Sequence, residues 1–436
     1  MRAIKLSEIS ISTSRQRKEF AAEPLLELSN SIAKNGLLHP IVVRQAPNGY
    51  QLVAGGRRIK AIEALWAMGE KLRYGDKQFV EGIVPCNYLG DLDPIDAFEC
   101  ELEENLRRED LSWQDRCVAT SQLVELRRLQ AQKGGRVPPL LTDLSPTIYP
   151  NHDPKYAQAM VHDEVILAKH LKDPDVASAA TAKDGMKVIR RKEEASRNAA
   201  LGERIGKTFS AADHTLIQDD CIRWMEGQAD GQFDVILTDP PYGIDAQDFN
   251  DSGGKADVLG HTYNDSYDAW CLLVHRFARE AYRLSKPQAH CYTFCDIDNF
   301  LELRDILRGS GWKCFRTPLI WYNPSSQRAP WPQTGPHRRW QMCLYAIKGD
   351  RPVLKLASDL VEYRSDENLG WAAQKPVALY RDLLSRSCRA GDSVLDPFCG
   401  SGTIFPSAHE LKVKAAGVEL DPVAYGIAVK RLKELK

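Results

Sequence analysis

An acid, two prolines and a tyrosine end an apolar run at residues 233–244, FDVILTDPPYGI. The run FDVILT has the composition of a buried strand, and Asp239 follows it directly. Pro240 and Pro241 fix the backbone and carry no N–H. The Asp239 carboxylate and the Pro240 carbonyl could therefore accept hydrogens from a ligand without a competing donor. Tyr242 adds a flat aromatic face. Because Asp and Pro are also common in ordinary turns, the tetrapeptide alone is equally compatible with a structural turn.

Two glycines follow a second predicted strand near the C-terminus. The strand SVLD ends at Asp396, and the turn FCGSG places Gly400 and Gly402 before a predicted helix. Without Cβ atoms, these glycines let a ligand approach the backbone beside the helix N-terminus. The next predicted strand ends at Glu419, 23 positions after Asp396 (419 − 396). An acid at an offset of roughly 20 residues reaches ribose hydroxyls in dinucleotide folds.

The same segment favours a cationic cofactor over a phosphorylated one. The turn lacks the G-x-G-x-x-G pattern that accommodates a pyrophosphate, and the acid at Asp396 would repel a phosphate. S-adenosylmethionine has an unphosphorylated ribose, a sulfonium and an ammonium, and it suits such a site. An ordinary βαβ unit with a glycine turn is the alternative.

Four motifs together resemble those of the permuted, beta-type amino-group DNA methyltransferases, over about residues 215–436. They are TDPPYG, the QKP at 374–376, DPFCGSGT and VELD, in that order. The resemblance implies that S-adenosylmethionine is held by Asp396, Phe398, Gly400, Gly402 and Glu419, with Lys375 and Pro376 beside its methionine part. It also places Asp220 near the cofactor adenine, although Asp219 stands where the family has glycine.

The resemblance to these enzymes also implies a catalytic role for four residues of this sequence, namely Asp239, Pro240, Pro241 and Tyr242. The lone pair of an exocyclic base amine is delocalised into the ring. Accepting the amine's two hydrogens at Asp239 and at the Pro240 carbonyl would localise that lone pair for attack on a methyl group. Tyr242 would stack on the base once it has left the duplex. This direct transfer needs no metal. Asp at the first motif position favours adenine N6, with cytosine N4 and RNA methylation as alternatives.

The N-terminal region, over about residues 4–112, resembles the ParB/sulfiredoxin-like domain of partition proteins. The matching pieces are RQRKEF, NGLLHPIVVR, GYQLVAGGRRIKA and ENLRREDLS. The resemblance implies a cytidine nucleotide site formed by Arg17, Gly55, Arg57, Arg58, Glu104 and Asn105. Gly56 stands where the family usually has Glu, which argues against nucleotide hydrolysis. A ParB-like, nucleotide-switched DNA-binding protein with an inactive transferase domain is therefore the rival interpretation of the whole chain.

Residues 323–340, NPSSQRAPWPQTGPHRRW, form a long polar loop that could contact double-stranded DNA. Interleaved arginine and aromatic side chains suit phosphate contact and base stacking. The residues concerned are Arg328, Trp331, Arg338 and Arg339. An ordinary surface loop is as compatible with this composition.

The chain of 436 residues is predicted to form three regions. These are a ParB-like α+β domain (1–112), a helical middle region (113–200) and a Rossmann-like α/β methyltransferase domain (205–436), whose alternating strands and helices predict a largely parallel sheet. Prolines predict an irregular loop over 134–155, and 197–213 has the composition of a linker.

The composition sets broader limits on function. The 58 Lys and Arg against 59 Asp and Glu give no global basic field, so DNA contact must come from local patches. Eleven cysteines without a C-x-x-C pair predict free thiols, no zinc site and a reducing cytoplasm. Neither a signal peptide nor a membrane span is expected. A homodimer is compatible with the sequence.

Overall fold

The computed structural model describes residues 2–11, 22–88, 111–133, 140–149, 152–244, 266–326, 333–367, 369, 371 and 374–435. The chain forms two compact units, Met1–Lys187 and Val188–Lys436, and each is described by itself. The three-part division at 112 and 200 stays a prediction. Among the described residues, none of the helices is long and apolar enough to cross a membrane.

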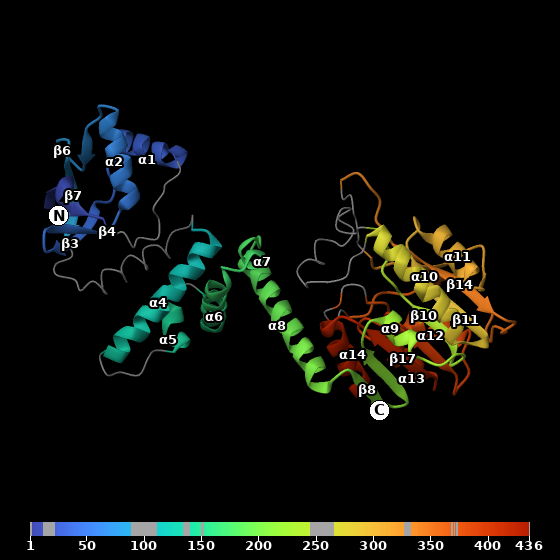
Figure 1. The fold of residues 1–436 in the computed structure, drawn as a ribbon. Helices are drawn as coiled ribbons and strands as arrows, with labels where there is room; N and C mark the ends of the chain where they lie inside the picture. Colours follow the sequence, from blue (N-terminus) through green and yellow to red (C-terminus); the bar gives the residue numbers. More distant parts are fainter. Residues whose placement is uncertain are drawn as a thin grey trace. The chain divides into compact units, whose positions relative to one another are not determined.

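The first unit begins with a five-stranded sheet in the order β1-β7-β3-β4-β2 (blue in Figure 1). Its strands are β1 (Arg2–Lys5), β2 (Ile9–Ser10), β3 (Ile41–Ala46), β4 (Gly49–Ala54) and β7 (Ile83–Tyr88), and a separate ribbon pairs β5 (Leu72–Tyr74) with β6 (Lys77–Phe79). The helices are α1 (Ala22–Asn35) and α2 (Gly56–Ala67). β3 and β4 form an antiparallel hairpin, and Ile41, Val43 and Ile62 lie in the buried core.

Helices follow in the described part of this unit. They are α4 (Trp113–Lys133), α5 (Leu141–Ile148), α6 (Pro154–His170) and α7 (Pro174–Ala177). The prediction of an irregular loop over 134–155 is wrong for α5, which is helical despite Pro146. The Asp143 carboxylate accepts the Leu140 N–H at 2.9 Å, and Leu144 is buried against Val161. Burial and capping therefore outweigh the cost of an interior proline.

Helix α8 (Ala182–Ile205) continues through the predicted linker, which is wrong for 197–205, and β8 (Thr208–Ala211) follows. The C-terminal part of α8 is buried against α14 (Pro422–Glu434). A Cβ on Gly426 would lie closer than 3.0 Å to the Asn198 carbonyl, and one on Gly202 would meet the Tyr425 ring. Composition indicated a linker, whereas close packing at Gly202 and Gly426 holds this segment in the second unit.

The second unit is built on a sheet in the order β15-β13-β14-β11-β10-β16-β17-β9-β8, with β12 beside β14. The remaining strands are β9 (His214–Gln218), β10 (Phe233–Thr238), β11 (Ser285–Cys295), β12 (Lys313–Cys314), β13 (Leu319–Tyr322), β14 (Trp340–Lys348), β15 (Leu360–Glu362), β16 (Ser393–Asp396) and β17 (Lys414–Glu419). The expected parallel pairing holds for β9, β17, β16, β10 and β11. β14 runs antiparallel to both β11 and β13, so the sheet is mixed rather than largely parallel.

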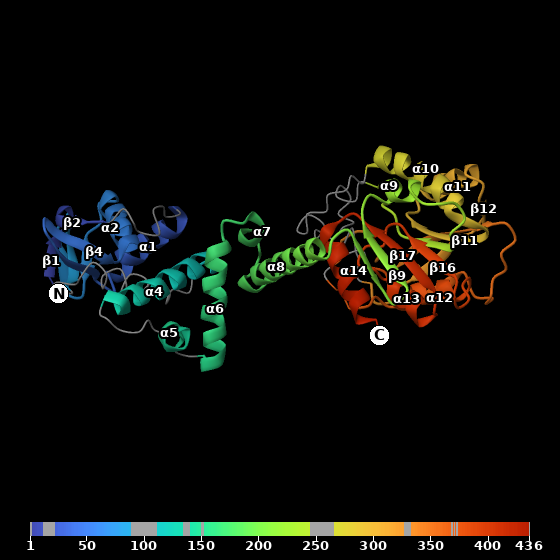
Figure 2. The same ribbon diagram turned by 60° about the horizontal axis from the view of Figure 1, so that its bottom comes forward.

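Helices cover both faces of this sheet (Figure 2). One face carries α9 (Cys221–Glu226), α10 (Tyr267–Leu284) and α11 (Phe300–Gly309), and the other carries α12 (Val377–Ser385), α13 (Ile404–Glu410) and α14. Strand β10 is buried throughout: Val235 and Leu237 join one core, and Phe233 and Ile236 join the other. Burial on both faces explains why FDVILT is apolar except for Asp234 and Thr238.

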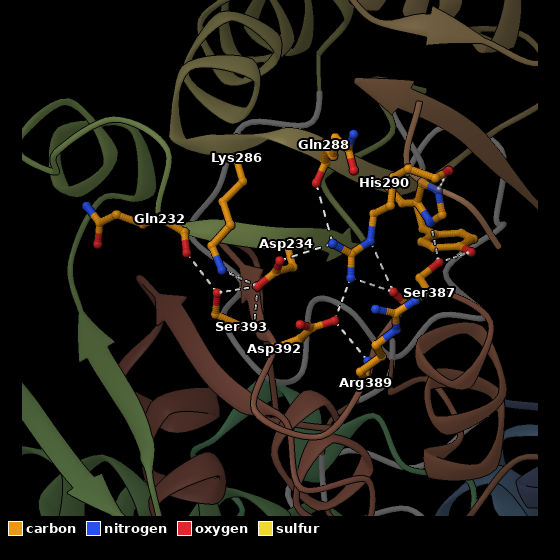
Figure 3. A network of polar contacts seen from close by, with 11 residues as sticks. Gln232, Asp234, Lys286, Gln288, His290, Ser387, Arg389, Asp392 and Ser393 are labelled. Carbon is orange, nitrogen blue, oxygen red and sulfur yellow. Dashed lines mark hydrogen bonds and ion pairs between the residues drawn. The ribbon is translucent and has the colours of Figure 1, made fainter. Parts of the chain in front are cut away.

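Asp234 belongs to a polar network at the amino edge of the parallel strands (Figure 3). Its carboxylate accepts hydrogen bonds from Lys286 at 2.6 Å and from Arg351 at 3.0 Å. Burial alone would raise the pKa of Asp234, but the hydrogen bonds from Lys286 and Ser393 lower it overall. Arg351 also donates to the Ser387 carbonyl at 2.7 Å. The network thus joins β10, β11 and β16 at the edge opposite the candidate site.

Candidate active site

Five neighbouring parallel strands each end at an acid. In sheet order, β9, β17, β16, β10 and β11 lead to Asp219, Glu419, Asp396, Asp239 and Asp296. The carboxyl ends of parallel strands meet at one edge, which is where open α/β sheets bind ligands. A row of carboxylates there favours a cationic ligand and repels phosphate. No group of three or more His, Cys, Asp or Glu side chains within the described ranges is arranged to hold a metal ion.

Asp396 and Glu419 are held by hydrogen bonds at the ends of β16 and β17. Thr238 donates its hydroxyl to Asp396 at 2.7 Å, and the Gly400 N–H donates to Glu419 at 2.7 Å. Burial raises the pKa of Asp396 to about 8 and that of Glu419 to about 7. Burial therefore shifts both carboxyls toward their protonated forms in the ligand-free protein, and a bound cation would favour their ionised forms.

The pKa of Asp396 leads to a prediction about stability. Because folding favours its protonated form, its contribution is fully present below the ordinary aspartate pKa and is lost as the pH rises through about 8. We expect the free energy of unfolding of the wild type, relative to Asp396→Asn, to fall as the pH rises from about 5 to about 9. Urea denaturation of the ligand-free protein measures this difference. Asp305→Asn, at an exposed site on α11, should show no such trend, and a difference that rises with pH would contradict the prediction.

The glycine turn after β16 has a backbone that only glycine adopts readily. Gly400 has φ 52° and Gly402 has φ 77°, and a Cβ on Gly402 would lie within 3.0 Å of Ala428. The Trp371 indole nitrogen lies 3.1 Å from the place of a Cβ on Gly400. Phe398 packs edge-on against Phe277, with ring centroids 5.8 Å apart. Trp371 therefore adjoins the turn although no sequence motif indicated it.

The turn after β10 is fixed by contacts from distant segments. Tyr242 donates its hydroxyl to an Asp239 oxygen at 2.7 Å, and burial raises the pKa of Tyr242 well above its usual range, so the phenol keeps its proton. Asn299 donates to the Tyr242 carbonyl at 2.6 Å. Gly243 has φ 66° and lies directly against Trp270. Asn299 and Trp270 were not predicted, because the sequence carries no signal for contacts over such separations.

Lys375 lies in the segment before α12 and contacts the carboxylate of Asp239. Its ammonium forms an ion pair with Asp239, lies 3.4 Å from the Tyr242 hydroxyl and lies 4.9 Å from the centre of the Phe294 ring. Lys375 is only 5% exposed. Thr403 donates to its carbonyl at 3.0 Å, and Pro376 is the N-cap of α12. The structure thus brings a predicted cofactor residue into contact with the predicted catalytic acid.

Asp219 and Asp220 follow β9, and the backbone of Asp219 contacts Glu419. The Asp219 N–H donates to the Glu419 carbonyl at 3.2 Å, and the Asp219 side chain pairs with Arg223. Asp220 caps α9 by accepting the Arg223 N–H at 2.8 Å. The substitution of aspartate for glycine at 219 is therefore accommodated by an ion pair on the helix that follows.

The described part of the 323–340 loop approaches the same edge of the sheet. Arg338 forms an ion pair with Asp296, which is 4% exposed, and Ser326 donates to the Arg338 carbonyl at 2.9 Å. The Arg339 carbonyl accepts the Asn323 N–H at 2.7 Å. Arg338 therefore fixes the loop in addition to any contact with DNA. Arg328 and Trp331 lie outside the described residues.

The predicted nucleotide residues in the first unit are only partly described. Gly55 has φ 105° and is the N-cap of α2, with Arg57 in the first turn. Arg58 donates to the carbonyls of His39 at 3.0 Å and Pro40 at 2.7 Å, so its guanidinium ties α2 to the segment before β3. Arg17, Glu104 and Asn105 lie outside the described residues.

An open α/β sheet with a glycine turn and a row of acids at its carboxyl edge defines a Rossmann-like cofactor-binding domain. Residues 233–430 match the family model described as DNA methylase, of the N6/N4 class, and residues 1–68 match the ParB N-terminal domain. The second unit therefore contains an N6/N4 DNA methylase domain, and the first begins with a ParB N-terminal domain. The predicted fusion and fold class are confirmed.

Individual relatives cover one part of the chain each. The type II methyltransferase M.HpaI of Haemophilus parainfluenzae is 23% identical over 50% of this chain and 74% of its own length. The chromosome-partitioning protein Spo0J of Thermus thermophilus is 39% identical over 30% of this chain and 44% of its own length. The crystal structure of an M1.HpyAVI-SAM complex is 20% identical, with a TM-score of 0.39, over 50% of this chain and 98% of its own.

Proposed function

We propose that this protein transfers a methyl group from S-adenosylmethionine to an exocyclic amine of a DNA base, with adenine N6 as the main target. The observation that carries the proposal is the position of Asp239 and Tyr242 after β10, directly beside the glycine turn of β16 in the same sheet. The hydrogen bond from Thr238 to Asp396 links the two strand ends across a separation of 158 residues.

The residues around the glycine turn suit this cofactor. Asp396 and Glu419 offer carboxylates to a ribose and a cation, and Gly400 and Gly402 leave room beside the backbone. Phe398, Lys375, Pro376 and Asp220 complete the proposed set. When bound, S-adenosylmethionine supplies an electrophilic methyl group.

Asp239 and the Pro240 carbonyl are proposed to accept the two amine hydrogens, with Pro241 keeping the turn rigid. This arrangement favours a pyramidal nitrogen with a localised lone pair. The Tyr242 ring offers the base a stacking face, and its hydroxyl orients Asp239 through the 2.7 Å hydrogen bond. Positioning thus supplies the main catalytic effect.

Adenine N6 is preferred because the motif begins with Asp239, and cytosine N4 is the second candidate. Double-stranded DNA is the proposed partner, contacted in part by Arg339 and by Arg328 and Trp331. The ParB-like domain is proposed to hold the enzyme on DNA, with a cytidine nucleotide near Gly55 and Arg57. Ten free cysteines among the described residues suit a reducing cytoplasm.

The proposal is tested by incubating unmethylated DNA with the full-length protein and S-adenosylmethionine carrying a labelled methyl group. Mass spectrometry of the hydrolysed nucleosides identifies the product. We expect labelled N6-methyladenine. Detection of N4-methylcytosine instead would change the proposed target to cytosine N4. Methyl transfer to RNA alone, or to no nucleic acid, would refute the proposal.

A further inference from the structure

The Asp239 carboxylate already has a partner on each oxygen. One oxygen accepts the Tyr242 hydroxyl at 2.7 Å, and the other is paired with the Lys375 ammonium. The pair is shielded from water, since the side chains of Lys375 and Asp239 are 6% and 14% exposed. Shielding from water strengthens the attraction between the two charges and makes either charge costly to leave without a partner.

This pair conflicts with the proposed chemistry. While methyl moves from a sulfonium to an amine, the reacting atoms carry a net positive charge, and Asp239 is useful because it is negative. An ammonium on the same carboxylate would neutralise that charge and repel the reacting cation. Lys375 must therefore exchange its partner before transfer, and at 5% exposure it cannot exchange it for bulk water.

We propose that Lys375 is a positioning residue that moves its ion pair from Asp239 to the carboxylate of the bound cofactor, so that cofactor binding frees the catalytic acid. The inference rests on the proposed function. S-adenosylmethionine carries an α-carboxylate, and its arrival supplies the acceptor that Lys375 requires. This exchange keeps the Asp239 carboxylate paired in the ligand-free enzyme. It leaves that carboxylate able to accept the base amine only after the cofactor has bound.

The local backbone suits a side-chain movement of this kind. Thr403 holds the Lys375 carbonyl at 3.0 Å, Arg431 holds the Thr403 hydroxyl at 2.8 Å, and Pro376 begins α12. The backbone of Lys375 is thus anchored, whereas its four-carbon side chain can rotate between two acceptors. The Phe294 ring, 4.9 Å from the ammonium, offers a cation–π contact during that movement.

The test measures ligand affinity by titration calorimetry, without turnover. The probe is S-adenosylhomocysteine, which lacks the sulfonium charge but keeps the carboxylate, and its decarboxylated analogue is the comparison. Asp239→Asn should release Lys375 and tighten S-adenosylhomocysteine binding by about tenfold. Lys375→Met should weaken binding by about tenfold and should abolish the gain from Asp239→Asn in the double variant.

Two controls distinguish the exchange of the Lys375 ion pair from general effects of the substitutions on ligand binding. The decarboxylated analogue should show less than about a twofold response to either substitution, because it offers Lys375 no acceptor. Lys355→Met removes an exposed lysine paired with Asp382 at 3.3 Å and should leave binding unchanged. If Lys375→Met fails to fold, Asp239→Asn with the two ligands still decides the outcome.

The inference is overturned if Asp239→Asn binds S-adenosylhomocysteine no more tightly than the wild type, or if it binds both ligands equally more tightly. Either result, with DNA methylation intact in the wild type, leaves the proposed function standing. A wild-type protein that binds neither ligand refutes both proposals.

Discussion

Asp239→Asn is expected to reduce methyl transfer to DNA by at least about a hundredfold. The substitution keeps the shape of the side chain and its hydrogen bond from Tyr242, but it removes the negative charge that faces the reacting cation. The amide can also present a donor where only acceptors are useful. Single-turnover transfer of labelled methyl, with saturating DNA and cofactor, measures the effect on the chemical step.

The matched control is Asp305→Asn, at an exposed position on α11 that pairs with Arg308. Its transfer rate should equal that of the wild type. Retention of more than about a tenth of the wild-type rate by Asp239→Asn would show that the carboxylate is structural. Loss of cofactor binding in that variant would lead to the same conclusion.

Gly426→Ala is expected to lower the free energy of unfolding of the second unit by about 2–3 kcal/mol. Gly426 lies inside α14, and a Cβ there would come closer than 3.0 Å to the carbonyl oxygen of Asn198 on α8. The added Cβ is fixed to the backbone of α14 and would meet backbone atoms of α8, so no side chain can rotate away to relieve the contact. Helices α8 and α14 must separate, and the packing around Tyr425 would be lost with them.

Gly309→Ala provides the comparison, because Gly309 is also helical and a Cβ there would meet nothing within 4 Å. Alanine at this position should change stability by less than about 1 kcal/mol, and in the favourable direction. Urea denaturation followed by circular dichroism measures both variants. Equal stability of the two variants would mean that the α8–α14 contact adapts freely.

The strands and their acidic ends could be predicted from sequence because both are local properties. FDVILT and SVLD are apolar runs that stop at a charged residue, and Asp239, Asp396 and Glu419 follow from those stops. Parallel strands place such ends at one edge, so their proximity required no knowledge of side-chain contacts. The pairing direction of β14 was missed because the apolar pattern of a strand does not encode its direction.

Other features depend on contacts between distant segments. The ion pair between Lys375 and Asp239 joins residues 136 positions apart, and Asn299 reaches Tyr242 over 57 positions. Composition was misleading at α5, where burial of Leu144 overrides a proline, and at 197–205, where small residues are needed for close packing. Arg338 resembled a phosphate contact in sequence, but it is also the partner of the buried Asp296.

The order of the strands has a consequence for how the protein is made. A ribosome completes β10 and the turn at residues 239–242, here called the acceptor turn, long before it reaches β16 and β17, although these strands belong to one stretch of the sheet. Until residues 393–419 have emerged, β10 lacks one of its two hydrogen-bonding partners. A chain that stops early would carry the acceptor turn without Asp396 and Glu419. Incomplete synthesis should therefore yield an inert product, and activity should appear only after residues 393–419 have been translated and have joined the sheet.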